Sequence, residues 1–97
     1  MTQVVNLKTD QYDIYIGRPS KWGNPFSHKD DTLSEFKVSS RKESIEKYGK
    51  WIVTQTHLMD SLHELKDKRL GCFCKPSKCH GDILVQLVET QFSEDLF

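Results

Sequence analysis

The stretch GCFCKPSKCHGDIL, residues 71–84, brings all three cysteines of the chain together with a histidine and an aspartate. Alternate side chains of a strand share a face, so Cys72 and Cys74 are expected on one face and the residue between them on the other. The chain then turns into a helix, from which Cys79 or His80 is directed back toward the sheet. The stretch therefore predicts a strand-to-helix unit that gathers the thiols in one place.

Zinc binding is one interpretation of this cluster. The ligands would be Cys72, Cys74 and Cys79, with His80 or a distant group as the fourth. Against it, the spacing C-x-C-x4-C-H differs from the C-x-x-C pairs of closed zinc sites. Neighbouring helical residues also point about 100° apart, so Cys79 and His80 can bind one ion only from a loop or a frayed helix end. An iron–sulfur cluster needs a spacing that is less familiar still.

A reactive or ligand-binding pocket is the second interpretation. Near a helix N-terminus, unpaired N–H groups and the helix dipole favour the thiolate of Cys79. His80 and Asp82 add proton-transfer groups, so these three residues are the predicted catalytic set if the protein is an enzyme. The same N–H groups can bind a phosphate instead. The third interpretation is packing alone, because cysteine is among the residue types most often buried.

A second motif, GRPSKWGNPF at residues 17–26, directly follows a predicted strand. Open α/β sheets bind ligands at this position. The arginine and lysine of the motif suit an anion, its tryptophan offers a stacking surface, and its asparagine offers hydrogen bonds. Glycine, proline and asparagine are also typical of a purely structural turn, which is the alternative. The predicted ligand-binding residues are Arg18, Ser20, Lys21, Trp22, Gly23 and Asn24.

Hydrophobic patterning predicts the remaining elements. Strands are expected at 3–7, 12–17 and 68–74. Helices are expected at 39–55, at 57–67, and from 76–77 to about residue 90. Residues 27–39 are expected to form a surface loop, and 92–97 a tail that docks its aromatic residues or frays. The order β-β-loop-α-α-β-α predicts one α/β domain over residues 1–97, with a short, mostly parallel sheet covered by about three helices.

The first helix carries the clearest local signals. Ser40 followed by Glu43 has the spacing of a capping box. Ile45, Tyr48 and Ile52 then form an apolar stripe at helical spacing. A glycine at position 49 inside this pattern costs about 1 kcal/mol relative to alanine and suggests close packing.

Composition narrows the classes of function. Fourteen basic residues balance fourteen acidic ones, which disfavours bulk DNA binding, because phosphate neutralisation requires a basic excess. No apolar run approaches the roughly 20 residues of a membrane span, and no export signal is expected. Three clustered cysteines do not suit a secreted disulfide framework, so a reducing cytoplasm is the predicted setting.

The two motifs together resemble the uncharacterised domain-of-unknown-function 4326 family of small bacterial and phage proteins. The resemblance rests on IGRP and KWGNPF within residues 16–26, and on GCFC and CHGDIL within residues 71–84. A phenylalanine stands between the first two cysteines where the family more often has tryptophan. The resemblance implies that both motifs belong to one module and to one site, in a bacterial or phage-infected cytoplasm.

The leading hypothesis is a pocket for a nucleotide-like or other phosphate-bearing small molecule, formed where the two motifs meet. Whether the ligand is processed stays open at this stage. The alternative is a zinc-stabilised module that engages an unidentified protein without catalysis. A nucleic-acid accessory protein that stacks bases on Trp22 is the weakest hypothesis, because the chain has no net charge.

Overall fold

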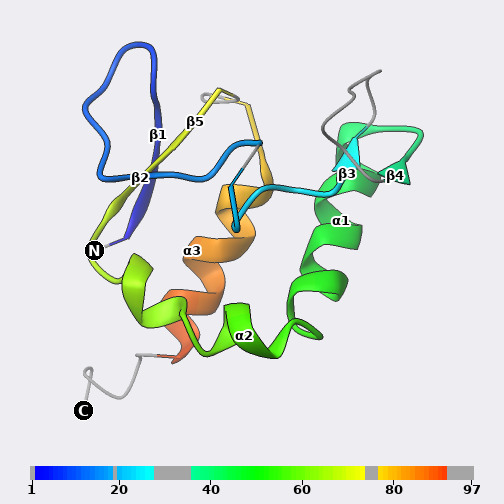
Figure 1. Cartoon of the computed structure of the whole chain (residues 1–97). Coiled ribbons are helices and arrows are strands. Elements are labelled where there is room, and N and C mark those ends of the chain that lie inside the picture. Colours follow the sequence, from blue (N-terminus) through cyan, green and yellow to red (C-terminus); the bar gives the residue numbers. More distant parts are fainter. Residues whose placement is uncertain (1, 19, 28–35, 74–76, 92–97) are drawn as a thin grey trace.

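The computed structural model describes residues 2–18, 20–27, 36–73 and 77–91 of the chain (Figure 1). The predicted tail at 92–97 lies outside these residues. The elements in chain order are β1 (Gln3–Asn6), β2 (Ile14–Tyr15), β3 (Phe26–Ser27), β4 (Phe36–Lys37), α1 (Arg41–Ile52), α2 (Thr56–Met59), the 3-10 helix η1 (Leu62–Leu65), β5 (Arg69–Cys72) and α3 (His80–Gln91).

A parallel sheet with the strand order β1-β5-β2 lies at the centre of the fold. In β5, Leu70 is paired with Val4 of β1 on one side and with Ile14 of β2 on the other. Leu70 is fully buried, as expected for the middle of a parallel sheet that helices cover. The predicted α/β class with a short, mostly parallel sheet is confirmed.

The second predicted strand, 12–17, is shortened to Ile14–Tyr15 in the structure, although the N–H groups of Asp13 and Ile16 on either side still donate to carbonyls of β5. The reason lies in the residues before it. The Asp13 carboxylate accepts the backbone N–H of Arg69 at 2.8 Å. The ring of Tyr12 lies against Gly71, so that a Cβ added to Gly71 would come within 2.7 Å of Tyr12 Cγ. At the start of the strand the Arg69 N–H is therefore bound by a side chain and not by a backbone carbonyl.

A second, two-stranded parallel sheet joins β3 and β4. Ser27 of β3 and both residues of β4 fall within the segment 27–39, which was expected to be a surface loop throughout. Residues 28–35 lie outside the described part of the chain. Two-residue strands are too short to show a hydrophobic period, so sequence patterning could not detect them.

Helix α1 begins where its capping signal predicts. The Ser40 hydroxyl accepts the backbone N–H of Glu43 at 3.1 Å. The return bond differs from a standard capping box, because Glu43 Oε1 accepts the N–H of Ser39 at 2.7 Å and the Ser39 hydroxyl at 3.0 Å. The predicted stripe points inward through Tyr48 and Ile52, which are fully buried.

The second predicted helix, 57–67, divides into two short helices, α2 and η1. The Ser61 hydroxyl donates to the His57 carbonyl at 2.9 Å at the break. In a 3-10 helix residues three apart share a face, so Leu62 and Leu65 stay on the inward side beside Leu58. All three leucines therefore stay buried despite the break, and each is at most 2% exposed.

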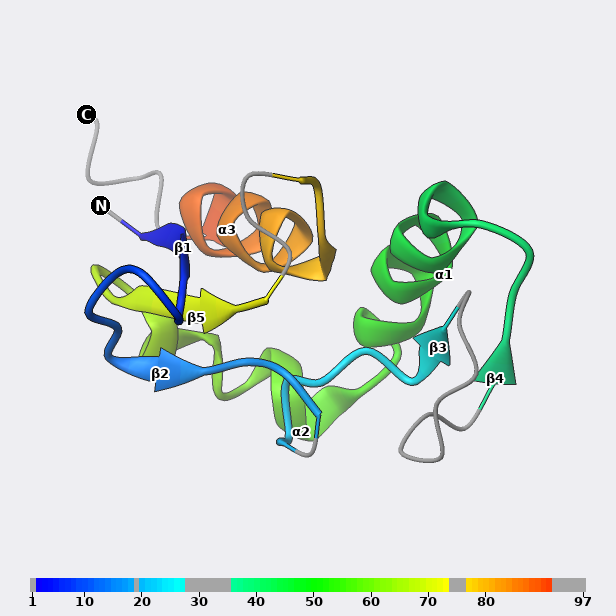
Figure 2. The same cartoon turned by 90° about the horizontal axis from the view of Figure 1, so that it is seen from above.

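Helix α3 lies between the three-stranded sheet and α1 (Figure 1, Figure 2). Its first turn sits directly on the sheet, because a Cβ on Gly81 would come within 2.8 Å of both Val4 Cγ2 and Ile16 Cδ1. Gly49 of α1 faces the same helix at a greater distance, 3.6 Å from its Cβ position to Ile83 Cδ1. Only a glycine at position 81 lets α3 approach the sheet this closely.

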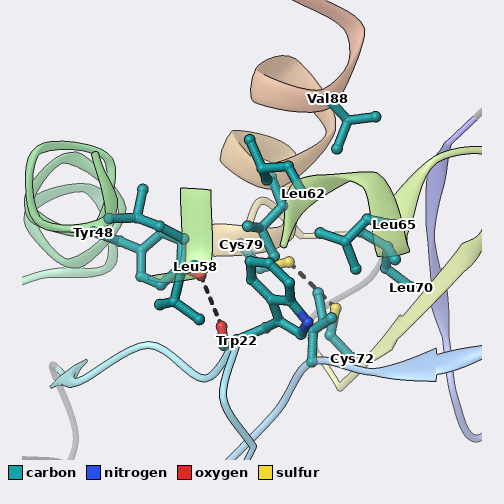
Figure 3. Packing of buried hydrophobic residues seen from close by; sticks show 12 residues of the cluster. Trp22, Tyr48, Leu58, Leu62, Leu65, Leu70, Cys72, Cys79 and Val88 are labelled. Carbon is teal, nitrogen blue, oxygen red and sulfur yellow. Dashed lines mark hydrogen bonds between the residues drawn. The ribbon is translucent and has the colours of Figure 1, made fainter. Parts of the chain in front are cut away.

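One hydrophobic core joins the sheet to the helices (Figure 3). Within it, Trp22, Cys72 and Cys79 lie together and are at most 3% exposed. The remaining members of the core are Ile16, Tyr48, Ile52, Leu58, Leu62, Leu65, Leu70, Leu84 and Val88.

None of the described helices is long and apolar enough to cross a membrane.

The ion pair between Asp13 and Arg69 gives the first prediction. Hydrogen bonds from the Arg69 side chain and backbone lower the pKa of Asp13 from 3.8 to about 2. The lowered pKa stabilises the fold above pH 3.8, and this contribution disappears as the pH falls toward 2. In Arg69→Gln we expect the pKa to rise toward 3.8, measured by carboxyl NMR titration. Lys42→Gln, at an exposed position of α1, is the control, and a wild-type pKa near 3.8 would contradict the pairing.

Gly81 of α3 and Gly49 of α1 give a matched pair of variants, because they differ in the space available to a Cβ. Gly81→Ala should lower the free energy of unfolding by about 1–3 kcal/mol, because the new Cβ overlaps the rigid Val4 side chain. Gly49→Ala should raise it by about 0.5–1 kcal/mol, because its Cβ has ordinary space in mid-helix. Urea unfolding followed by circular dichroism measures both. Equal stability of the two variants would refute the close seating of α3.

Candidate functional site

The loop between β2 and β3 is held by its own hydrogen bonds. The Ser20 hydroxyl donates to the Gly17 carbonyl at 2.6 Å, and the Gly23 N–H donates to the Ser20 carbonyl at 3.0 Å. Arg18 Nη1 donates to the Asn24 carbonyl at 2.6 Å, across the base of the loop. The guanidinium thus helps to fix the loop while its side chain stays partly exposed.

Trp22 and Asn24 anchor this loop on α1. Trp22 is 2% exposed, and its carbonyl accepts the Tyr48 hydroxyl at 2.8 Å. Burial raises the pKa of Tyr48, which keeps the hydroxyl protonated as the donor. Asn24 Nδ2 donates to Ser44 Oγ at 2.8 Å, and Asn24 Oδ1 accepts the Phe26 N–H at 2.9 Å. In this structure the indole ring therefore belongs to the core and presents no stacking surface to solvent.

Among the described residues of the loop, Lys21 is exposed while the others are buried or half-buried. Its Nζ lies 2.7 Å from Glu64 Oε1 of η1, and both side chains are more than 40% exposed. The same ammonium lies 5.4 Å from the ring centroid of Trp22. Lys21 thus links the loop to η1 through a solvent-screened ion pair, which is worth little stability.

His80 connects the two sequence motifs. Its Nε2 lies 2.7 Å from the Ile16 carbonyl, and because a carbonyl can only accept, this nitrogen carries the proton. The imidazole also meets the Tyr48 ring edge-on, with 4.9 Å between centroids. His80 is 8% exposed, so its buried hydrogen bond joins the end of β2 to the start of α3.

Cys79 caps helix α3. Its Sγ accepts the Gly81 N–H at 3.3 Å, and the Asp82 carboxylate accepts the Cys79 N–H at 3.1 Å. The Asp82 bond is the return half of a capping box, while the thiol takes the place of the usual hydroxyl and accepts from Gly81, one residue earlier than in the standard box. The helix therefore begins at His80, and the predicted start at 76–77 was wrong; Ser77 is outside the helix and Pro76 is outside the described residues.

The thiols of Cys72 and Cys79 face each other inside the core. Their sulfur atoms are 3.2 Å apart, one at the end of β5 and the other at the start of α3 (Figure 3). The prediction that the helix start points back toward the strand is confirmed for this pair. The third predicted zinc ligand, Cys74, lies outside the described residues.

Metal binding finds no support among the residues that the structure describes. Nowhere in residues 2–18, 20–27, 36–73 and 77–91 do three or more histidine, cysteine or acidic side chains gather in a way that could hold an ion. His80 directs Nε2 to a backbone carbonyl and not to the sulfur pair. The zinc interpretation with Cys72, Cys74, Cys79 and His80 thus stays a prediction.

A strip of four residues, three in contact through their side chains and Arg18 through its backbone carbonyl, crosses the sheet at its carboxyl edge. Lys8, after β1, places its Nζ 5.7 Å from the ring centroid of Phe73, which follows β5. The Phe73 ring meets Tyr15 of β2 edge-on, with 6.4 Å between centroids. The Tyr15 hydroxyl donates to the Arg18 carbonyl at 2.8 Å. Lys8, Phe73, Tyr15 and Arg18 are called the edge strip below.

Sequence reasoning did not select Lys8 or Phe73 as site residues. The alternation of a strand does place Phe73 on the face opposite Cys72, and Phe73 is 56% exposed. This alternation was the available signal. Lys8 carried no comparable signal, because its position depends on β1 lying beside β5, two strands far apart in the sequence.

Comparisons with known proteins place the chain in a family. A model described as Domain of unknown function (DUF4326) matches residues 3–90, and the chain belongs to that family. The chain is 34% identical over 96 residues to an uncharacterised 12.4 kDa protein in the nrdA-td intergenic region of Enterobacteria phage T4, covering 98% of this chain and 84% of the phage protein. The family resemblance expected from the two motifs is confirmed.

A second relative is an uncharacterised protein of Acanthamoeba polyphaga mimivirus. It is 37% identical over 93 residues, which cover 77% of this chain and 65% of the mimivirus protein. The chain thus spans slightly less than two thirds of that relative. No solved structure gives a significant match.

The buried imidazole of His80 gives a prediction on pH. Burial lowers the pKa of His80 below its usual 6.5, and this outweighs the opposing effect of the bond to Ile16. Below pH 6.5 the unfolded chain binds a proton that the folded chain does not, so stability falls as the pH drops and is constant above that pH. The slope of the free energy of unfolding against pH approaches about 1.4 kcal/mol per pH unit.

In His80→Gln, which keeps an N–H donor for Ile16 but does not titrate, the slope should flatten. Urea midpoints measured between pH 5 and 7.5 test this. The control is His57→Gln, at an exposed position, which should keep the wild-type slope. A wild-type slope in His80→Gln would contradict a neutral, buried His80.

Proposed function

We propose that this member of the DUF4326 family binds a nucleotide-like, phosphate-bearing small molecule at the carboxyl edge of its three-stranded sheet. The observation that carries the proposal is the edge strip. It joins an exposed aromatic ring, Phe73, to the ammonium of Lys8 on one side and, through Tyr15, to the backbone of Arg18 on the other, and its members come from all three strands or the loops after them.

The chemistry of the edge strip matches the two halves of a nucleotide. An exposed aromatic ring stacks on a base regardless of its hydrogen-bonding pattern. Lysine and arginine bind phosphate, the arginine through a planar fork of donors. Parallel α/β sheets bind ligands just outside the carboxyl ends of their strands, which is where these residues lie.

The remaining residues of the predicted site support this surface. Arg18 joins the strip through its carbonyl and fixes the loop through its guanidinium, while Lys21 pairs with Glu64 of η1. Ser20, Trp22, Gly23 and Asn24 hold the loop in place through the bonds and packing described above. The stacking role predicted for Trp22 passes to Phe73, because Trp22 is 2% exposed and Phe73 is 56% exposed.

The proposal is one of binding. Cys79 and Asp82 cap α3, and His80 bonds the end of β2. These bonds give all three residues a structural role, so the proposal assigns them no catalytic step. The Asp82 carboxylate also occupies the first N–H group at the start of α3, so the phosphate is assigned to the side chains of the edge strip and not to this helix terminus.

The proposal predicts a ranking of ligands in isothermal calorimetry. Adenosine and guanosine mono-, di- and triphosphates should bind more tightly than either the parent nucleosides or ribose 5-phosphate, because only the nucleotides supply both halves. Phe73→Ala should weaken nucleotide binding by about 5- to 150-fold, from the 1–3 kcal/mol that stacking contributes per base. Lys8→Ala should weaken nucleotides while leaving nucleosides unchanged.

Two matched controls separate this effect from general damage. Val53→Ala removes another exposed hydrophobic side chain, 52% exposed at the end of α1, and Lys42→Ala removes an exposed lysine of the same helix. Both should bind like wild type. Absence of binding across the panel, or wild-type affinity in Phe73→Ala, would refute the proposal. Binding to a single-stranded oligonucleotide but to no mononucleotide would assign the surface to nucleic acid instead.

A further inference from the structure

The sulfur pair of Cys72 and Cys79 has no role in the proposed binding surface. The two sulfur atoms lie 3.2 Å apart, and both residues are at most 3% exposed. The structure holds them as thiols, not as a disulfide. They stand at opposite ends of the segment 72–79, which joins the central strand β5 to helix α3.

The surroundings of the two sulfurs differ. Cys79 Sγ accepts the Gly81 N–H at the N-terminus of a twelve-residue helix, where backbone donors and the helix dipole stabilise negative charge on sulfur. Cys72 lies at the end of a strand, with Cys79 as the sulfur across from it. One sulfur is thus placed to attack an oxidant and the other to resolve the product.

We propose that Cys72 and Cys79 form a reversible disulfide when the protein meets a peroxide, so that the pair is a redox-modification site. This inference is independent of the proposed ligand. Disulfides of cytosolic proteins are usually transient and redox-sensing, which favours a reversible link over a permanent one. The product would be a covalent link between β5 and α3.

The reaction balances with hydrogen peroxide as the oxidant. The Cys79 thiolate attacks one peroxide oxygen, the O–O bond breaks, and hydroxide leaves and takes up a proton to become water. Cys79 is then a sulfenic acid. The Cys72 sulfur attacks Cys79 Sγ, the S–O bond breaks, and a second water leaves. Two thiols are oxidised to one disulfide and one peroxide is reduced to two waters; a dithiol reductant reverses the change.

The geometry requires little movement. A disulfide bond is about 2.05 Å long, so the sulfurs must approach by roughly 1 Å from their present separation. Because both sulfurs are buried, a small oxidant such as hydrogen peroxide is favoured over a bulky disulfide. Local opening at the start of α3 gives access without global unfolding.

Peptide mapping tests the pairing directly. Protein treated with hydrogen peroxide is denatured and alkylated with N-ethylmaleimide, and the number of alkylated cysteines should fall from three to one. Reduction with dithiothreitol before alkylation should restore all three. Trypsin cuts after Arg69 and Lys78 but not between Lys75 and Pro76. Peptides 70–78 and 79–97 should therefore stay joined until they are reduced.

Cys74→Ser identifies which cysteine of peptide 70–78 is used, and it alters neither proposed sulfur. This variant should keep the linked peptides and lose both of its remaining alkylation sites on oxidation. Peroxide treatment in urea is the second control, because an unfolded chain should also link through Cys74 in the wild type. In native buffer the link should be confined to Cys72 and Cys79.

Three results would overturn the proposal. In the first, all three cysteines stay alkylatable at peroxide levels that oxidise a free model thiol. In the second, the native wild type links Cys79 to Cys74, which Cys74→Ser would reveal by losing the link. In the third, protein purified without chelator carries about one zinc per chain that Cys72→Ala removes, which would make the pair metal ligands.

Discussion

The hydrogen bond from His80 to the Ile16 carbonyl is the contact on which the arrangement of this protein depends. Ile16 donates its own N–H to the Gly71 carbonyl at 3.1 Å, so its backbone is held by β5 on one side and by α3 on the other. The direction in which the following loop leaves the sheet is set at this point. The same bond fixes the first turn of α3, where Gly81 allows the helix to touch the sheet. A bond between residues 64 positions apart therefore holds the two motifs together as one unit.

Most of the polar residues in these motifs are needed to make the fold possible. A buried polar group without a partner costs about 1–3 kcal/mol, and the loop could not fold back onto α1 if its polar groups stayed unpaired. Asn24 and Tyr48 supply the partners, and in the part of the chain that the structure describes no buried side-chain nitrogen or oxygen lacks one. Residues that suggest chemistry in the sequence can thus be required for packing, and the exposed Phe73 becomes the more informative candidate for recognition.

The sequence predicts what depends on near neighbours and misses what depends on distant ones. The start of α1 follows from Ser40 and Glu43, three residues apart, and the inward leucines follow from helical spacing even though their helix is broken. The start of α3 was missed because cysteine is not among the preferred capping residues, although Asp82 has the spacing of a capping box. The burial of Trp22 depends on Tyr48, which no local pattern connects to it.

The same property of a strand explains why thiols and an exposed ring occur side by side. Cys72 and Phe73 are consecutive, so their side chains project to opposite faces of the sheet, one into the core with Cys79 and the other toward Lys8 and solvent. Any backbone movement that brings the Cys72 sulfur closer to Cys79 also displaces the adjoining residue, Phe73. A covalent change at the sulfurs would therefore be felt at the Phe73 ring through a single peptide unit. The backbone between Cys72 and Phe73 thus links the sulfur pair in the core to the exposed contacts of the Phe73 ring.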